Sequence, residues 1–170
     1  MTMMGSPALT IVALVGAVVG GVPAMANASE GWAINGTYTV TANGEWAKTN
    51  EVYRDEAVVR STWTITSTCT SLQDCAGEVT SDQGWSAPVV GTNGEWRVER
   101  IIKNWEPCAD GTAADGRQLF RFYPVDEQGQ FAVFGSPVLA GEDKTVGPSG
   151  ACGINMPLVI SMPLRLTRVG

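Results

Sequence analysis

Carboxylates are the side chains of this sequence with the clearest capacity for chemistry. Two carboxyl groups facing a cleft could hydrolyse a glycosidic bond, one as general acid and the other as base or nucleophile. The available carboxylates include Glu51, Asp55, Glu56, Glu95, Glu99, Asp110 and Asp115. No spacing singles out a pair among them, and Glu95 and Glu99 lie beside arginines, as on a solvated strand face. Hydrolysis is therefore an alternative function and no catalytic residue is assigned.

The absence of histidine excludes several other chemistries. Neither a Ser-His-Asp or Cys-His catalytic group nor an imidazole metal site can form without it. The 17 acidic side chains outnumber the 11 basic ones, and the net charge is −6. Nucleic-acid binding through neutralised phosphates is therefore not expected. We also expect no metal and no cofactor.

Tryptophans are the strongest candidates for a binding site. Trp63 and Trp96 fall on the apolar faces of strand-like runs, which predicts core positions. Trp46, Trp85 and Trp105 follow or approach turns, where a flat ring can stack on a sugar or line the mouth of a barrel. We predict that these three residues bind an apolar or glycan ligand; filling of the fold is the competing interpretation of each.

Four cysteines, Cys69, Cys75, Cys108 and Cys152, indicate two disulfides. Zinc is the less favoured alternative, because no pair of cysteines has the C-x-x-C spacing. Three disulfide connectivities are possible. A bridge between Cys69 and Cys75 across a local turn is the least strained choice, and its partner bridge would then join Cys108 to Cys152.

The N-terminal segment has the composition of a secretory signal peptide. Its first 29 residues contain no charged side chain, and residues 8–22 form an apolar run. Pro23 follows, and then small residues suited to cleavage after Ala26 or Ala28. We therefore expect a signal peptide at 1–28 and a secreted β domain at 29–170 that has no transmembrane span after cleavage. The mature domain would be secreted or held at the cell envelope, where disulfides form.

Apolar and polar residues alternate through most of the remaining chain, a pattern typical of strands. Strands are expected at 36–42, 44–52, 57–68, 77–81, 84–90, 95–102, 118–123, 130–134 and 158–167. Within 95–102, Arg100 is the exception on the apolar side. Pro157 and Pro163 predict that the last strand lies at a sheet edge or carries a bulge.

Turn residues separate these strands. Asn43-Gly44 and Asn93-Gly94 match the two-residue type I′ hairpin turn. Residues 103–116 and 135–155 are expected to be irregular, and no long helix is expected. Eight or nine strands in about 140 residues predict a single all-β domain, an antiparallel β-barrel or β-sandwich of about eight strands.

Several short motifs carry a resemblance to a known group of proteins. They are Thr62–Ile65 leading to Cys69, then Cys75, Asn93–Trp96, Trp105–Thr112 and Cys152-Gly153. Together they resemble a group of small exported proteins of mycobacteria and related actinobacteria. The resemblance supports pairing Cys69 with Cys75 and Cys108 with Cys152, and it implies no catalytic residue.

A second similarity is to calycin barrels, which open with a Gly-x-aromatic triplet and set a late arginine against the ring. Gly36-x-Tyr38 with Arg165 or Arg168 could supply these groups. This similarity favours a lipocalin-like barrel over a sandwich.

These observations together predict an exported, disulfide-stabilised β domain that binds an apolar or glycan ligand, a lipid or a sugar, at the cell envelope. The alternatives are an envelope-polymer hydrolase with a carboxylate pair and a purely structural or protein-interaction module.

Overall fold

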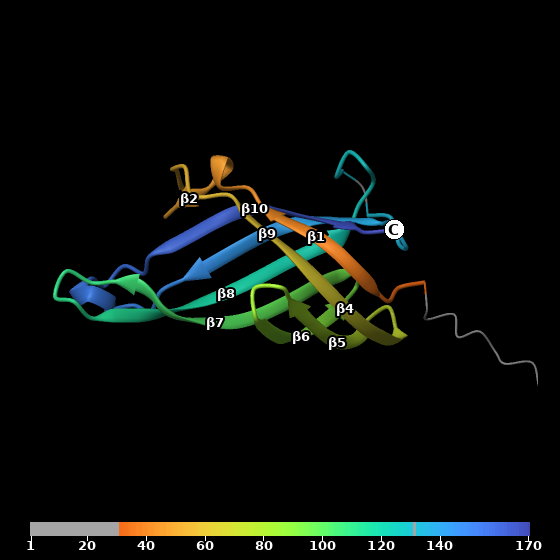
Figure 1. Cartoon of the computed structure of the whole chain (residues 1–170), viewed down its shortest axis with the longest axis horizontal. Coiled ribbons are helices and arrows are strands. Elements are labelled where there is room, and N and C mark those ends of the chain that lie inside the picture. The colour runs from red at the N-terminus through yellow and green to blue at the C-terminus, as the bar shows by residue number, and fades with distance from the viewer. Residues whose placement is uncertain (1–30, 131) are drawn as a thin grey trace, which may run out of the picture.

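Eight antiparallel strands form a closed barrel (Figure 1). The computed structural model describes residues 31–130 and 132–170. The barrel strands are β1 (Gly36–Ala42), β4 (Val59–Ser71), β5 (Asp74–Ser81), β6 (Trp85–Thr92), β7 (Glu95–Pro107), β8 (Ala113–Pro124), β9 (Val138–Val146) and β10 (Val159–Arg168). They are hydrogen-bonded in this order, and pairing of β1 with β10 closes the barrel. The expected all-β barrel of about eight strands is confirmed.

The expected signal peptide, 1–28, lies outside the described residues. In the part of the chain that is described, no helix is both long and apolar enough to cross a membrane.

Residues 44–52 do not form the single strand that alternation predicts. They form the short 3₁₀ helix η1 (Gly44–Trp46) and the strand β2 (Lys48–Thr49), which pairs with β3 (Val52–Tyr53). Asn43 caps η1 by accepting a hydrogen bond from the Glu45 amide at 3.1 Å, so Asn43-Gly44 is not a type I′ turn. That conformation occurs at Asn50 and Glu51, whose φ angles are 47° and 67°. Asn93-Gly94 adopts it as predicted, with φ angles of 53° and 82°.

The two segments expected to be irregular contain strands. β7 and β8 extend through much of 103–116, and β9 lies within 135–155. Among the described residues of the predicted strand 130–134, the only strand-like pairing is one isolated bridge, between Val125 and Ala132.

The last strand is not a sheet edge. β10 pairs with β9 along one side, and with β1 and β2 along the other. Pro163 lies between the β1 and β2 ladders, where β10 changes partner and a missing amide hydrogen is tolerated.

Large side chains from all parts of the sheet fill the barrel. Trp63 and Trp96 are each 1% exposed, which confirms their predicted core positions. The other fully buried large residues are Tyr38, Phe122, Ile65, Leu139, Leu166, Val79, Val89 and Val98. The rings of Trp63 and Phe120 meet edge to face, with centroids 4.8 Å apart.

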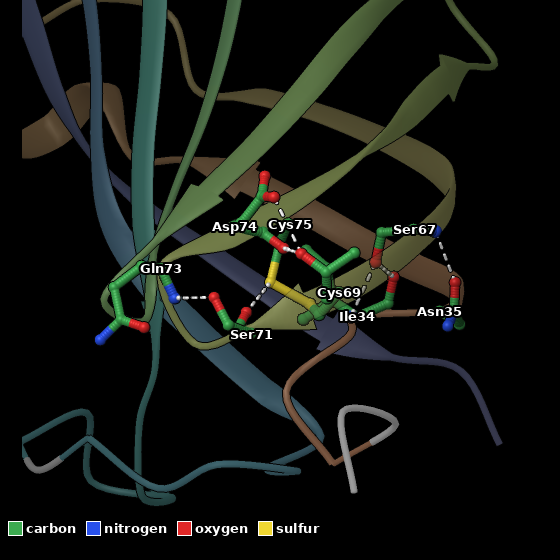
Figure 2. Close-up of a disulfide and its surroundings, with 9 residues drawn as sticks. Ile34, Asn35, Ser67, Cys69, Ser71, Gln73, Asp74 and Cys75 are labelled. Atoms are coloured by element: carbon green, nitrogen blue, oxygen red, sulfur yellow. Dashed lines mark hydrogen bonds between the residues drawn. A yellow bond between two sulfur atoms is a disulfide. The ribbon is translucent and has the colours of Figure 1, made fainter. Parts of the chain in front are cut away.

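Both disulfides have the predicted pairing. Cys69 and Cys75 are directly opposite each other on β4 and β5, with Cα atoms 4.1 Å apart (Figure 2). Cys108 and Cys152 join the turn between β7 and β8 to the 3₁₀ helix η2 (Ala151–Gly153), which precedes β10. These two segments lie together at the left end of the barrel in Figure 1.

The segment before β1 is fastened beside the first disulfide. The Ser67 hydroxyl donates to the Ile34 carbonyl at 2.8 Å and accepts from the Ile34 amide at 3.0 Å. The Asn35 side chain accepts from the Ser67 amide at 2.6 Å (Figure 2). These contacts hold the chain against β4 where it enters the barrel.

Candidate functional site

The three tryptophans predicted to bind a ligand lie in three different surroundings. Trp46, on η1, is 61% exposed and lines a groove on the outer wall. Trp85, at the start of β6, is half-buried and lines a small cavity inside the barrel. Trp105, near the end of β7, is half-buried against neighbouring strands. The structure therefore divides the predicted site into separate places.

Trp105 fills space in the barrel wall. Its ring lies directly on Gly116 of β8, where an added Cβ atom would come within 2.7 Å of Trp105 Cδ2. Thr145 Cγ2 of β9 approaches the same point. The packing interpretation of this tryptophan is the one its contacts support.

Trp46 forms an exposed aromatic pair with Tyr53 of β3. Tyr53 is 67% exposed, and the two rings meet edge to face with centroids 6.4 Å apart. Lys48 Nζ lies 5.1 Å from the centroid of the Tyr53 ring. These residues line a groove of about 330 Å³, together with Gly141, Glu142, Ser161, Met162 and Pro163. We call this the aromatic groove.

Hydrogen bonds to the barrel fix the hairpin that carries the aromatic groove. The Asn50 amide donates to the Val159 carbonyl, and the Asn50 side chain accepts from the Val159 amide, both at 2.8 Å. The Arg54 amide donates to the Ala47 carbonyl at 3.0 Å. The aromatic rings are exposed, but their backbone is held on β10.

A chain of polar side chains crosses the interior of the barrel. Arg100 Nε donates to Gln118 Oε1 at 2.7 Å, and Gln118 Nε2 donates to both carboxylate oxygens of Asp143 at 2.8 and 2.9 Å. Gln118 and Asp143 are 7% and 2% exposed. Burial raises the pKa of Asp143 to about 6, against the opposing effects of the Gln118 hydrogen bonds and the Arg100 charge.

One residue of this polar chain could be recognised in the sequence. Arg100 is a charged residue on the apolar side of its strand, and it lies inside as that position predicts. Gln118 and Asp143 were not among the candidates. They follow from the register of β7, β8 and β9, which sets Arg100 opposite Gln118.

Three of the candidate carboxylates hold contacts with neighbouring residues. Glu99 pairs with Arg117 at 2.8 Å, and Asp115 pairs with Lys103 at 2.6 Å. Asp110 accepts from the amide and hydroxyl of Thr112 within its turn. Among residues 31–130 and 132–170, no three potential acidic or cysteine ligands are grouped as a metal site would require.

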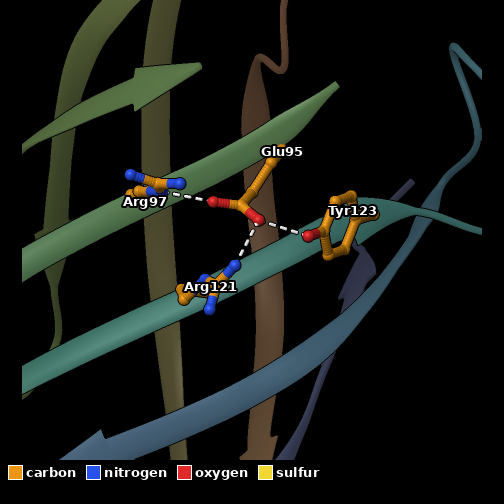
Figure 3. Close-up of polar contacts among 4 residues, drawn as sticks. All are labelled: Glu95, Arg97, Arg121 and Tyr123. Atoms are coloured by element: carbon orange, nitrogen blue, oxygen red, sulfur yellow. Dashed lines mark hydrogen bonds and ion pairs between the residues drawn. The ribbon is translucent and has the colours of Figure 1, made fainter. Parts of the chain in front are cut away.

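Glu95 is the centre of a second polar cluster, on the outer wall (Figure 3). Its carboxylate accepts hydrogen bonds from Arg97, from Arg121 at 2.7 Å and from the Tyr123 hydroxyl. The hydrogen bond from Arg121 makes the largest contribution to lowering the pKa of Glu95 to about 2. The cluster ties the start of β7 to the end of β8.

Replacing Glu95 with Gln is expected to lower the free energy of unfolding by about 1–2 kcal/mol, because a charged acceptor of three hydrogen bonds is lost. The wild-type pKa lies below the ordinary value, so the contribution of Glu95 is present above about pH 4.5 and is lost as the pH falls towards 2. Urea denaturation between pH 2.5 and 5 measures this, with Glu99→Gln as the exposed control. Equal acid sensitivity of wild type and Glu95→Gln would contradict it.

The late arginine that lies beside the calycin-like triplet is Arg168 and not Arg165. Tyr38 of β1 is directly opposite Arg168 of β10, and a Cβ atom on Gly36 would lie 2.9 Å from Arg168 Nε. Arg165 instead donates to the Glu127 carbonyl at 3.0 Å. The glycine therefore leaves the room that the arginine side chain occupies.

Two larger grooves lie on the outer wall. One, of about 840 Å³, is bordered by β1, β8, β9, β10 and the segment after β8. The other, of about 660 Å³, follows the outer faces of β7, β8 and β9, and it combines apolar side chains such as Ile101 and Leu119 with charged ones such as Arg117 and Lys144. Neither is lined by a predicted tryptophan.

Comparison with known proteins shows a fold likeness only. No protein-family model matches the chain, and no curated protein sequence matches it. Among solved structures, the chain is similar to the monomer form of the PknI sensor domain of M. tuberculosis, with a TM-score of 0.56 and 15% identity. The match covers 81% of this chain and 88% of the other. The likeness shows a shared fold, and the resemblance to the small exported group rests on the sequence motifs alone.

Proposed function

We propose that this chain is an exported binding module whose ligand is a glycan held in the aromatic groove. The observation that carries the proposal is the pairing of two rings, Trp46 and Tyr53, each more than half exposed, over a groove that also contains charged and hydroxyl groups. A sugar presents C–H groups that stack on such rings. Its hydroxyls can bond to Glu142, Lys48 and Ser161, which line the same groove.

The interior of the barrel gives less support to an apolar ligand. Trp63, Phe120 and Phe122 occupy the space that a lipid would need, and the cavity beside Trp85 measures about 30 Å³. Small-molecule sites commonly measure about 300–1,000 Å³. The aromatic groove falls in that range, which favours the glycan over the lipid.

Export agrees with the two disulfides, since such bonds persist in oxidising compartments. The charge-free N-terminal segment has the composition of a signal peptide. The PknI sensor domain has a similar fold, and by analogy the ligand of this module would act as a signal or a tether at the cell envelope.

Replacing Trp46 with Ala is expected to weaken glycan binding about five- to thirtyfold, because stacking on one ring contributes on the order of 1–2 kcal/mol. Isothermal titration calorimetry with soluble oligosaccharides of mannose, arabinose and N-acetylglucosamine measures the effect, since its readout does not depend on the tryptophan that is replaced. Val52→Ala is the matched control, because Val52 is 67% exposed on the same hairpin but does not line the groove. Binding unchanged in Trp46→Ala, or no binding of any of the three by the wild type, would refute the proposal.

A further inference from the structure

The ladder between β6 and β7 stops halfway along the two strands. It runs from the pair Thr92–Glu95 to the pair Val89–Val98 and no further. The next residue of β6 is Pro88, which has no amide hydrogen to donate. Beyond it, residues 85–88 pair only with β5, and residues 99–102 of β7 pair only with β8. We call this interruption of the wall the unpaired stretch.

Trp85 and Arg100 meet across the unpaired stretch. The guanidinium carbon of Arg100 lies 4.4 Å from the centroid of the Trp85 ring. Trp85 also stacks on Phe120, with an interplanar angle of 7°, and it meets Trp63 edge to face with centroids 5.3 Å apart. These contacts hold the guanidinium group beside the interior cavity.

Several hydrogen-bond donors around this point have no partner in the described part of the chain. Arg100 uses Nε for Gln118, and within the described chain its other guanidinium nitrogens make no hydrogen bond. The indole nitrogens of Trp63 and Trp85 are both buried and likewise lack a partner among the residues described. Asp143, the nearby acceptor, already receives two hydrogen bonds from Gln118. An unpaired buried donor costs about 1–3 kcal/mol.

These same residues line a cavity of about 30 Å³, whose lining includes Trp63, Trp85, Arg100, Gln118 and Asp143. A single water molecule needs a cavity of roughly 10–15 Å³. The cavity therefore has room for about two water molecules or one small planar group. A carboxylate supplies two coplanar acceptor oxygens and matches the fork of an arginine.

We propose that this cavity is a second binding site, in which Arg100 and the indole groups of Trp63 and Trp85 receive the carboxylate of a small organic acid. The site is separate from the aromatic groove and needs a different ligand chemistry. The rest of the acid extends outward through the unpaired stretch beside Trp85.

Binding of an anion here is coupled to a proton on Asp143. The charged groups acting on Asp143 are Arg100 from β7 and Glu142 on its own strand; β8 presents Gln118, and the β10 residue opposite is Met162. A second negative charge beside an ionised Asp143 is repelled. The carboxylate therefore binds when Asp143 carries its proton.

The indole N–H signals of the ¹⁵N-labelled protein give a direct test. Sodium acetate is expected to shift the signals of Trp63 and Trp85 and leave that of Trp46 unchanged, with sodium chloride of equal ionic strength and neutral acetamide as controls. A glycan in the aromatic groove would move Trp46 instead, so the two proposals fail independently. Hexanoate binding tighter than acetate would identify the head of a longer chain, and equal binding a short free acid.

Replacing Arg100 with Gln is expected to weaken acetate binding at least about tenfold, because a charge-assisted bidentate contact is lost. Arg117→Gln, on the outer wall, is the matched control and should change it less than twofold. Trp85→Phe keeps the stacked ring but removes one donor, and should weaken binding about fivefold, which tests the site even if Arg100→Gln does not fold.

Acetate affinity should fall roughly eightfold from pH 6.5 to 7.5 in the wild type and stay constant in Asp143→Asn.

Three results would overturn the proposal. The first is the absence of any acetate-specific shift at Trp63 and Trp85, which would mean that the cavity holds water only. The second is an affinity unchanged in both Arg100→Gln and Trp85→Phe. The third is the same pH dependence in wild type and Asp143→Asn.

Discussion

Replacing Cys108 and Cys152 together with serine is expected to lower the free energy of unfolding by about 4 kcal/mol. The two cysteines are 44 residues apart, and a cross-link that closes a loop of this length removes about that much conformational entropy from the unfolded chain. A domain of this size has a total stability of only about 5–15 kcal/mol. The variant is therefore expected to be partly unfolded at elevated temperature, as measured by the urea midpoint and the thermal midpoint.

The shorter disulfide provides the matched control. Cys69 and Cys75 are six residues apart, so serine at both positions should cost about 2 kcal/mol. Amide exchange should also separate the two variants. Without the bond to Cys152, protection should fall first at the turn between β7 and β8, because the disulfide ties that turn to η2. A larger loss from the shorter disulfide would contradict the loop-entropy argument.

Strands with one buried face could be predicted from the sequence, and strands with two polar faces could not. β1 occupies the expected residues 36–42 because Tyr38, Val40 and Ala42 alternate inward. β9 was missed because its inward positions include Asp143 and Thr145, which are as polar as the outward ones. The alternation that marks a strand in the sequence is absent there, although the backbone pairs on both sides.

Turn chemistry was ambiguous at one of the two Asn-Gly sites that were predicted to be hairpin turns. Asn43 and Asn93 precede identical Gly-Glu-Trp triplets, yet Asn43 caps a 3₁₀ helix and Asn93 takes a positive φ in a hairpin. An asparagine side chain serves both conformations. The difference is set by pairing far away in sequence, since the Asn43 amide donates to the Pro163 carbonyl.

Only some residues of each proposed site could be predicted from the sequence. Trp46 was a candidate, but Tyr53 reaches it only because the turn at Asn50 and Glu51 folds β3 back on β2. Arg100 stood out on an apolar face, but its partner Gln118 lies 18 residues away across a ladder. The residue type and its position in a strand indicate which side chain is a candidate. Its contact partner follows only from the register of the paired strands.

The buried polar chain also affects stability, in the direction opposite to that of Glu95. Asp143 has a folded-state pKa raised to about 6 from an ordinary value of 3.8, so the folded protein holds this proton more tightly than the unfolded chain does. Its contribution to stability is complete below about pH 4 and is lost as the pH rises through 6. Glu95 contributes above about pH 4.5 and loses its effect towards pH 2. Together these two groups favour greatest stability at about pH 4–5.

Replacing Asp143 with Asn is expected to remove the decline between pH 4 and 7, which amounts to at most about 3 kcal/mol for a shift of this size. The asparagine oxygen still accepts a hydrogen bond from Gln118, and no charge is left to desolvate, so at pH 7 the variant should be the more stable protein. Urea midpoints at pH 4, 5, 6 and 7 measure the effect. Glu78→Gln is the matched control, because Glu78 is an exposed carboxylate on β5 and is not among the groups that act on Asp143. A wild-type stability that does not fall between pH 4 and 7 relative to Asp143→Asn would mean that Arg100 and Gln118 compensate fully for burial of this carboxylate.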